Sequence, residues 1–321
     1  MEEKQETDKT VLSEEEFATQ ATSGGTMTFS DAVTTGISTD LDKTIKGYTN
    51  QGFTMNPHTG DYFLTMLDGN SDNKVRLARV PYLGNNAGSV SAVNPTNIND
   101  FLTMGHANDC AYYNDRIYIV QGDGKGTNVI SYTTSLTGKK TYPYTYHDTK
   151  ANLGMTYFSS ICYQSGSGGW FILGGKGLLD EKTKEEGAKF ITAYFDGSKF
   201  IGVKFFTLEG VKSIIKIDGR DIQHQTACVK NWSYYRIFNH KESNGQIIKN
   251  TIVSYVLPGT FPSFSGTAPY VAHFNNEKKD RYFFEMEGLA YYNDDLYASA
   301  NVKVNKDDTL RNKVFKVTFK H

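Results

Sequence analysis

One short pattern occurs twice in this chain of 321 residues. Residues 111–118 read Ala-Tyr-Tyr-Asn-Asp-Arg-Ile-Tyr, and residues 290–297 read Ala-Tyr-Tyr-Asn-Asp-Asp-Leu-Tyr. In both copies an Asn-Asp pair separates two runs of aromatic and aliphatic residues. Asn and Asp tolerate the positive φ angles of a tight hairpin turn, whereas the flanking residue types favour strands. The pattern therefore predicts a β-hairpin that the chain uses more than once.

Three weaker copies of the same hairpin complete a series. They cover residues 53–64, 160–173 and 226–238, and all five hairpins are followed by a polar loop and another strand-like run. The copies follow one another at intervals of roughly 50 to 65 residues, slightly more than the repeat of a WD40 blade. We take as equivalent positions in the five hairpins Met55, Ala111, Cys162, Cys228 and Ala290.

The series predicts an all-β fold, a five-bladed β-propeller over residues 26–321 with four-stranded antiparallel blades. The last copy supplies only three strands, so we expect an N-terminal strand, at residues 26–29 or near Ile45, to close the ring and cover its edge. The abundance of Tyr (21), Phe (20) and Gly (30) agrees with an all-β chain. A two-sheet sandwich or a pair of small β domains is the alternative. Residues 1–25 are polar and acidic and are predicted to form a flexible tether.

Composition argues against several functional classes. The net charge is −1 and the 34 Lys and Arg residues are scattered, which argues against nucleic-acid binding. No apolar run is long enough to span a bilayer. The three cysteines show neither a disulfide framework nor the spacing of a metal site. We therefore expect a monomer with no cofactor and no metal site, although an ion or an ordered water could occupy the axis.

Polar residues mark one end of the expected axis. In a propeller the first strand of each repeat lines the axis, and the loops that lead into it converge at one end. Here polar residues stand just before the equivalent positions, on strands that are otherwise apolar. We predict that they form a ring that holds a hydroxylated ligand or an ion; alternatively, they only bind water in a channel. The predicted ligand-binding residues are Gln51, His106, Asn108, Asp109, Tyr157, Ser159, His224, Gln225, Glu285 and Glu287.

The case for catalysis from the sequence is weaker. His106 could titrate near neutral pH with Asp109 to orient it, but the sequence does not specify their geometry, and we assign no catalytic residue. A glycosidase needs two carboxylates on either side of the scissile bond. Five-bladed arabinanase-like enzymes resemble this chain in architecture and place acids on three blades. Here the axial acids, Asp109, Glu285 and Glu287, come only from the second and fifth copies.

A second resemblance rests on residues 105–114, Gly-His-Ala-Asn-Asp-Cys-Ala-Tyr-Tyr-Asn, with Gln-Gly-Phe at 51–53 and Glu-Gly-Leu-Ala at 287–290. Over about residues 45–321 the chain is similar to propellers of helveticin-like bacteriocins, phage tail receptor-binding proteins and surface proteins of Gram-positive bacteria. This resemblance implies recognition of cell-wall or surface glycans by a secreted or surface-attached protein. An acidic tether before such a domain would suit an exported lipoprotein or an anchored protein, although we find no lipobox or anchor in this sequence.

The leading hypothesis is a non-enzymatic binding module that recognises a carbohydrate or a cell-wall polymer through a polar pocket at the axis. Tyr112, Tyr157 or Tyr291 would supply rings that stack on sugar faces. Two alternatives stay open. One is a glycoside hydrolase or lyase that uses the axial carboxylates, and the other is a scaffold that contacts proteins through its polar loops.

Overall fold

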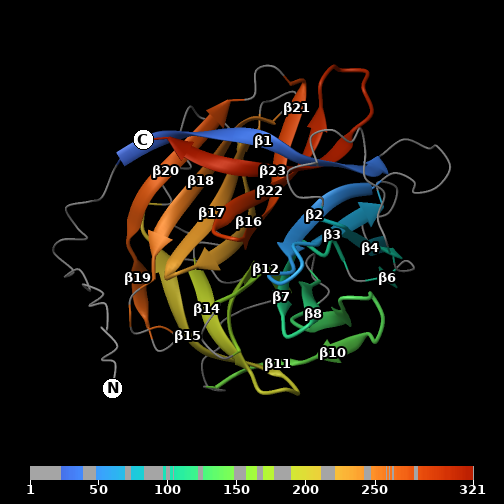
Figure 1. Ribbon diagram of the computed structural model, residues 1–321. Helices are drawn as coiled ribbons and strands as arrows, with labels where there is room; N and C mark the ends of the chain where they lie inside the picture. Colours follow the sequence, from blue (N-terminus) through green and yellow to red (C-terminus); the bar gives the residue numbers. More distant parts are fainter. Residues whose placement is uncertain are drawn as a thin grey trace, which may run out of the picture.

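In the part of the chain that the computed structural model describes, β-strands follow one another, joined by short turns (Figure 1). The structure describes residues 23–38, 48–68, 74–82, 97–98, 102–103, 105–121, 126–147, 157–164, 169–176, 189–210, 221–241, 247–257, 259, 261, 264–277 and 281–320. Within these ranges the chain is all-β, as predicted. The described residues include no helix long and apolar enough to cross a membrane.

The strands form five groups, each built on an antiparallel series of neighbours. The first group contains β2 (Tyr48–Met55), β3 (Tyr62–Asp68) and β4 (Lys74–Val80), with the short β5 (Asn97–Ile98) and β6 (Leu102–Thr103) both paired to β4. The second contains β7 (Asp109–Tyr113), β8 (Arg116–Val120), β9 (Val129–Thr133) and β10 (Lys140–Tyr142). The third contains β12 (Tyr157–Tyr163), β13 (Trp170–Lys176), β14 (Lys189–Phe195) and β15 (Phe200–Leu208).

Two further groups complete the fold and share one continuous sheet. The fourth group contains β16 (Asp221–Lys230), β17 (Ser233–Lys241), β18 (Ile247–Val256) and β20 (Tyr270–Glu277). The fifth contains β21 (Phe283–Tyr292), β22 (Asp295–Lys303), β23 (Arg311–Lys320) and β1 (Ser23–Ser38). Two short strands, β11 (Tyr144–Tyr146) and β19 (Gly266–Ala268), run parallel to β15 and cover its outer edge.

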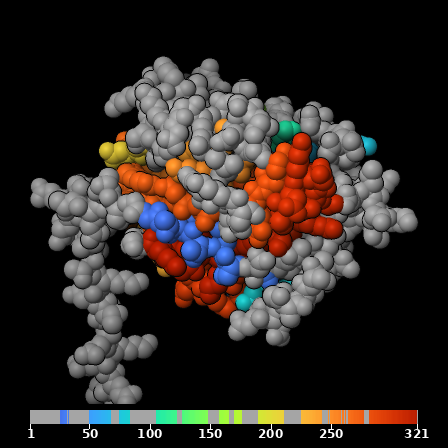
Figure 2. All heavy atoms as spheres, turned by 90° about the horizontal axis from the view of Figure 1, so that it is seen from above, coloured from blue at the N-terminus to red at the C-terminus, as the bar shows by residue number. Residues whose placement is uncertain are grey.

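The N-terminal strand β1 takes the outermost place in the fifth group. It pairs antiparallel with β23, where Thr26 faces Lys320, and parallel with β20, where Ser23 faces Ala272. In Figure 2 the blue surface of β1 lies among the orange and red surfaces of the C-terminal strands. Residues 26–29 thus lie beside the last strand, as expected from the count of strands. The strand begins three residues before the predicted boundary; residues 1–22 of the predicted tether, and the region near Ile45, lie outside the described residues.

The turns of the two strongest hairpins have the predicted geometry. Asn114 and Asp115 have φ angles of 47° and 55°, and Asn293 and Asp294 have φ angles of 47° and 67°. Two successive residues with positive φ form the tight turn whose twist matches that of the flanking strands. The hairpin prediction drawn from the repeated Asn-Asp pair is therefore confirmed.

Hydrophobic side chains gather in five clusters, each between two neighbouring groups. One cluster joins the first and second groups through residues such as Phe63 and Ile117. Another joins the fifth group to the first through Tyr297 and Tyr62, whose ring centroids are 6.4 Å apart. The first strands β2, β7, β12, β16 and β21 contact one another in that order, and β21 contacts β2. The groups therefore lie around a common axis with their first strands innermost, which is a propeller-like arrangement.

Two glycines allow the first strands to approach closely. A Cβ atom on Gly288 would lie 2.3 Å from the Cβ of Phe53 and 2.9 Å from its backbone nitrogen, and one on Gly52 would lie 2.7 Å from the Cα of Asp109. These distances are too short for non-bonded atoms, and the clash with Gly288 involves backbone that cannot rotate away. We expect Gly288→Ala to lower the free energy of unfolding by about 1–3 kcal/mol, the usual cost of overpacking.

Urea denaturation of the Gly288→Ala variant would measure this cost. Gly259→Ala is the matched control, because a Cβ there has nothing within 4 Å. Equal effects of the two substitutions would contradict the close approach of β21 to β2.

Candidate functional site

In each group one extra residue lies opposite the second strand, in a β-bulge within the first strand or, for β7, directly before it. In β21 the pairing passes from Met286–Ala300 to Gly288–Ser299, so Glu287 is the extra residue. Register shifts at the same place interrupt β2, β12 and β16, and the hydrogen bond from the Ala107 amide to the Gln121 carbonyl produces the same shift before β7. We call these extra residues the bulge residues: Gln51, Asn108, Ser159, Gln225 (with Thr226 beside it) and Glu287.

The bulge residues all belong to the predicted ligand-binding set. A bulge bends its strand and re-aims a side chain, and bulges often stand beside binding sites. The register also corrects one assumed equivalence, because Thr54 and not Met55 occupies the position of Ala111 in the first group. The five remaining predicted residues flank the bulges; they are His106, Asp109, Tyr157, His224 and Glu285. The side chain of His224 lies outside the described part of the structure.

Two carboxyl groups lie together at the bulge of β21. Glu287 is 2 % exposed, and its side chain is hydrogen-bonded to that of Glu285. Burial, and then the neighbouring Glu285 carboxyl, hold the pKa of Glu287 well above its ordinary value. The Asn301 Nδ2 donates to Glu287 Oε1 at 3.0 Å and to the carbonyl of Asn50 at 3.1 Å. Glu287 is therefore a buried acid that holds its proton more tightly than a free glutamate, within a polar link between β21, β22 and β2.

Asp109 forms a second buried polar link. Its Oδ1 accepts from the amide of Cys110 at 2.9 Å, and its Oδ2 accepts from the amide of Ile161 at 3.1 Å. Burial raises the pKa of Asp109 well above its ordinary value, although these hydrogen bonds and the charge of Arg236 oppose the rise. Because each of its oxygens accepts a hydrogen bond from a backbone amide, Asp109 links β7 to β12. Sequence reasoning recognised this acid as axial but did not foresee that both its oxygens engage backbone amides.

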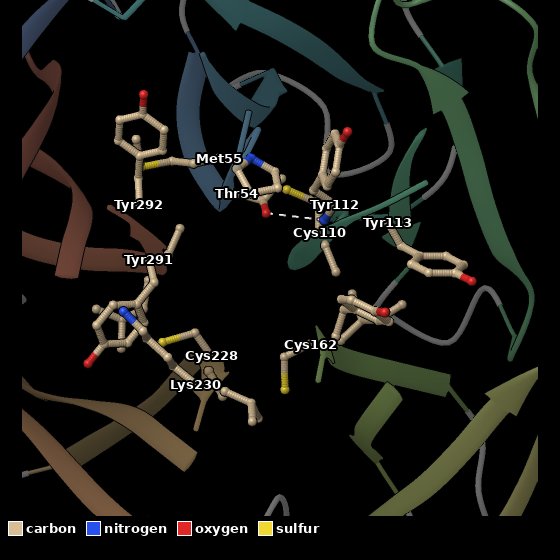
Figure 3. A pocket seen from close by; sticks show the side chains of 18 of the residues that line it. Thr54, Met55, Cys110, Tyr112, Tyr113, Cys162, Cys228, Lys230, Tyr291 and Tyr292 are labelled. Atoms are coloured by element: carbon tan, nitrogen blue, oxygen red, sulfur yellow. Dashed lines mark hydrogen bonds between the residues drawn. The ribbon is translucent and has the colours of Figure 1, made fainter. Parts of the chain in front are cut away.

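A cavity of about 630 Å³ lies at the opposite end of the axis, where the first strands end (Figure 3). The five equivalent positions all line it, and their small side chains explain why the centre is hollow; they are Thr54, Ala111, Cys162, Cys228 and Ala290. None of the ten predicted ligand-binding residues is among its lining residues. The structure therefore separates the bulge residues from this cavity along the axis.

Tyrosine rings form much of the cavity wall, and we call it the tyrosine cavity. Its tyrosines are Tyr112, Tyr113, Tyr163, Tyr291 and Tyr292. Neighbouring groups hold these rings in place: Tyr113 packs on Tyr163 with centroids 4.5 Å apart. The hydroxyl of Tyr112 donates to Asp115 Oδ1 at 2.7 Å, and its amide donates to Thr54 Oγ1 at 3.2 Å. Rings fixed in this way lose little further freedom when a ligand binds.

Sequence reasoning found part of this cavity. It named Tyr112 and Tyr291 as stacking residues, and both line the wall, whereas Tyr157 begins β12 at the other end of the axis. It missed Tyr113 and Tyr292, although the Tyr-Tyr pair stands directly before the Asn-Asp turn in both strong copies. The place of the Tyr-Tyr pair, between a small axial residue and the turn, was the signal that could have identified Tyr113 and Tyr292.

One lysine brings a positive charge to the wall. Lys230 forms an ion pair with Asp294, and its Nζ lies 4.7 Å from the ring centroid of Tyr291. Burial raises the pKa of the lining thiols Cys110 and Cys162 well above the ordinary value, so they remain uncharged at neutral pH. In the described part of the chain, no three His, Cys, Asp or Glu side chains are grouped to hold a metal ion.

Comparison with known proteins bears on the fold. No family model and no curated protein matches the chain. Among solved structures it is similar to the tail fiber of Staphylococcus aureus phage P68, with 12% identity, a TM-score of 0.54 and coverage of 90% of this chain and 52% of that one. It is also similar to a GH43_1 enzyme from Xanthomonas citri, with 12% identity, a TM-score of 0.48 and coverage of 95% and 92%.

A third similar structure is an alpha-L-arabinofuranosidase from Lactobacillus brevis, with 10% identity, a TM-score of 0.45 and coverage of 82% of this chain and 89% of that one. Of these three, the tail fiber alone exceeds a TM-score of 0.5, and this chain spans about half its length. Identities this low show similarity of fold and leave function to be argued from the site.

Proposed function

We propose that this chain is a five-bladed β-propeller, closed by β1, that binds a carbohydrate or a surface polymer without transforming it. The cyclic contacts of the first strands and the bulge repeated in all five groups support the blade count. The observation that carries the function is the tyrosine cavity on the axis. We further propose that the protein acts as a monomer outside the cell or on its surface.

Sugar recognition needs the two kinds of group that the cavity contains. The C–H faces of a sugar ring pack on aromatic rings, while its hydroxyl groups require hydrogen-bonding partners. Tyr112 and Tyr291 lie on different sides of the hollow in Figure 3, and Asn114, Asn293 and His58 also line it. The volume of about 630 Å³ falls in the usual range for a small-ligand pocket. A sugar of one or two rings would therefore fit between the tyrosines.

Substitution of one wall tyrosine tests this assignment. We expect Tyr112→Ala to weaken binding of a glycan, selected on a glycan array, by about fivefold, because a lost ring contact costs about 1 kcal/mol. Tyr146→Ala is the control, because Tyr146, the last residue of β11, is also half-buried but packs on His147 outside the cavity. Titration calorimetry would give the affinities and thermal unfolding would confirm that both variants fold.

The bulge residues offer the other proposed contact region. If Asn108→Ala weakens binding and Tyr112→Ala does not, the ligand occupies the end of the axis predicted from the sequence. If glycan arrays and cell-wall pull-down assays detect no binding at all, the proposed function fails.

A glycoside hydrolase is the second candidate, because the raised pKa of Glu287 favours the protonated form that a general acid needs. However, glycosidases hold their two carboxyl groups about 5–10 Å apart around the substrate, and these two are hydrogen-bonded to each other. Release of reducing sugars from a polysaccharide panel, abolished by Glu287→Gln, would establish hydrolysis in place of simple binding.

A further inference from the structure

Lys230 lies at the wall of the tyrosine cavity. It is the last residue of β16, its side chain is 19 % exposed, and its Nζ lies over the ring of Tyr291. The face of an aromatic ring attracts a cation and replaces part of its hydration. Figure 3 shows the lysine beside Tyr291 and Cys228 on one side of the hollow. A ligand that enters the cavity therefore meets an ammonium group with little water around it.

The partner of this lysine is a much more exposed group. Asp294 lies in the turn between β21 and β22, and its side chain is 93 % exposed. An ion pair with a partner so exposed to water contributes little, because water and salt screen it. An anionic group on a ligand, held inside the cavity, would interact with Lys230 under weaker screening than Asp294 does. Asp294 thus acts as an exchangeable partner at the mouth of the cavity.

Two tyrosines and the thiols of the wall bring no negative charge beside Lys230. Burial raises the pKa of Tyr112 to about 12 and that of Tyr291 further, so both phenols stay neutral at pH 7. The lining thiols are neutral for the same reason, as described above. Of the lining residues, His58 and Asp294 are exposed in turns.

We infer that the tyrosine cavity selects sugars that bear an anionic group, a carboxylate or a phosphate, and that Lys230 contacts this group after displacing Asp294. The inference rests on the proposed function, since it specifies the ligand of the same cavity. Uronic acids and phosphorylated sugars share this chemistry, because both present a sugar face to the tyrosines and a negative charge to the lysine.

Two matched pairs of glycans test the preference. The first pair is polygalacturonate and its methyl ester, and the second is phosphomannan and neutral mannan. The anionic member of at least one pair should bind at least about tenfold more tightly than its neutral counterpart, the range expected for a hydrogen bond to a charged group. The pair that shows the difference identifies carboxylate or phosphate as the anion.

Two substitutions should then act in opposite directions. Lys230→Met keeps the aliphatic stem and should lower the affinity for the anionic glycan about tenfold without changing that for the neutral one. Asp294→Asn removes the competing carboxylate and should raise the affinity for the anionic glycan several-fold. Asn tolerates the φ of 67° at this position, so the turn should persist.

Lys189→Met is the control, because Lys189 lies over the ring of Phe205, 4.3 Å from its centroid, and neither residue lines the cavity. It should leave all affinities unchanged. If neutral glycans bind as tightly as their anionic counterparts and Lys230→Met changes neither, the inference is overturned while the proposed function stands. If no glycan binds the unaltered protein, the proposed function fails and the inference fails with it.

Discussion

Deletion of residues 1–38 should abolish the cooperative unfolding transition of this protein. The deletion removes β1, which pairs with β23 on one side and with β20 on the other. Both strands would then present unpaired backbone groups at an open edge. The deletion also removes Met27, which is 1 % exposed, and Phe29, whose ring packs on those of Phe284 and Phe315. The expected loss, on the order of 5 kcal/mol or more, is comparable to the whole stability of a typical domain.

A shorter deletion is the control for this experiment. Removal of residues 1–22 leaves β1 in place and should not change the melting temperature. A peptide of residues 23–38, added to the longer deletion variant, should restore a cooperative transition by occupying the vacant position beside β23. Differential scanning calorimetry would report both effects. A deletion variant that melts cooperatively within a few degrees of the full chain would show that β1 does not hold the fifth group to the fourth.

The sequence predicted the parts of this fold that local chemistry specifies. The Asn-Asp turns and their flanking aromatic runs require only neighbouring residues, so the hairpins at 111–118 and 290–297 were predicted correctly. The position of β1 beside β23 was predicted by counting strands. The parallel pairing of β1 with β20, and of β11 and β19 with β15, was not, because pairs at sheet edges join distant segments without a turn to mark them.

The candidate site shows the same limit more sharply. The bulge residues lie at a nearly fixed offset from each hairpin, so the repeat was enough to select Asn108 and Glu287. The tyrosine cavity depends instead on small side chains from five separate strands that meet only in three dimensions. The burial of Asp109 also depends on contacts between distant segments. Nothing in the sequence around it indicates that both its oxygens accept hydrogen bonds from backbone amides.

Glu287→Gln should stabilise the protein at alkaline pH and should flatten the dependence of its stability on pH. The pKa of Glu287 is raised in the folded protein by burial and by Glu285, so the folded state binds this proton more tightly than the unfolded chain does. The favourable contribution of the protonated carboxyl is complete below the unfolded pKa of about 4.3. It falls as the pH rises and is lost through the raised pKa of the folded state.

Glutamine can form the hydrogen bonds of the protonated Glu287 side chain, but it does not ionise. Its Oε1 can accept from Asn301 as the carboxyl does, and its Nε2 can donate to Glu285 at any pH. Near pH 4 Glu287 keeps its proton, so we expect the two proteins to have similar free energies of unfolding. An ionised buried carboxyl costs several kcal/mol, so by pH 8 to 9 the variant should be more stable by on the order of 2 kcal/mol.

Urea denaturation between pH 4 and 9 would measure this difference. Asp109 also has a raised pKa, but it is present in both proteins and its contribution cancels in the comparison. Glu209→Gln, at an exposed position in the turn after β15, is the matched control and should leave the pH profile unchanged. Parallel profiles for Glu287→Gln and the unaltered chain would mean that Glu287 ionises freely. It could not then be the buried proton donor on which the hydrolase alternative depends, and recognition would be left to the tyrosine cavity.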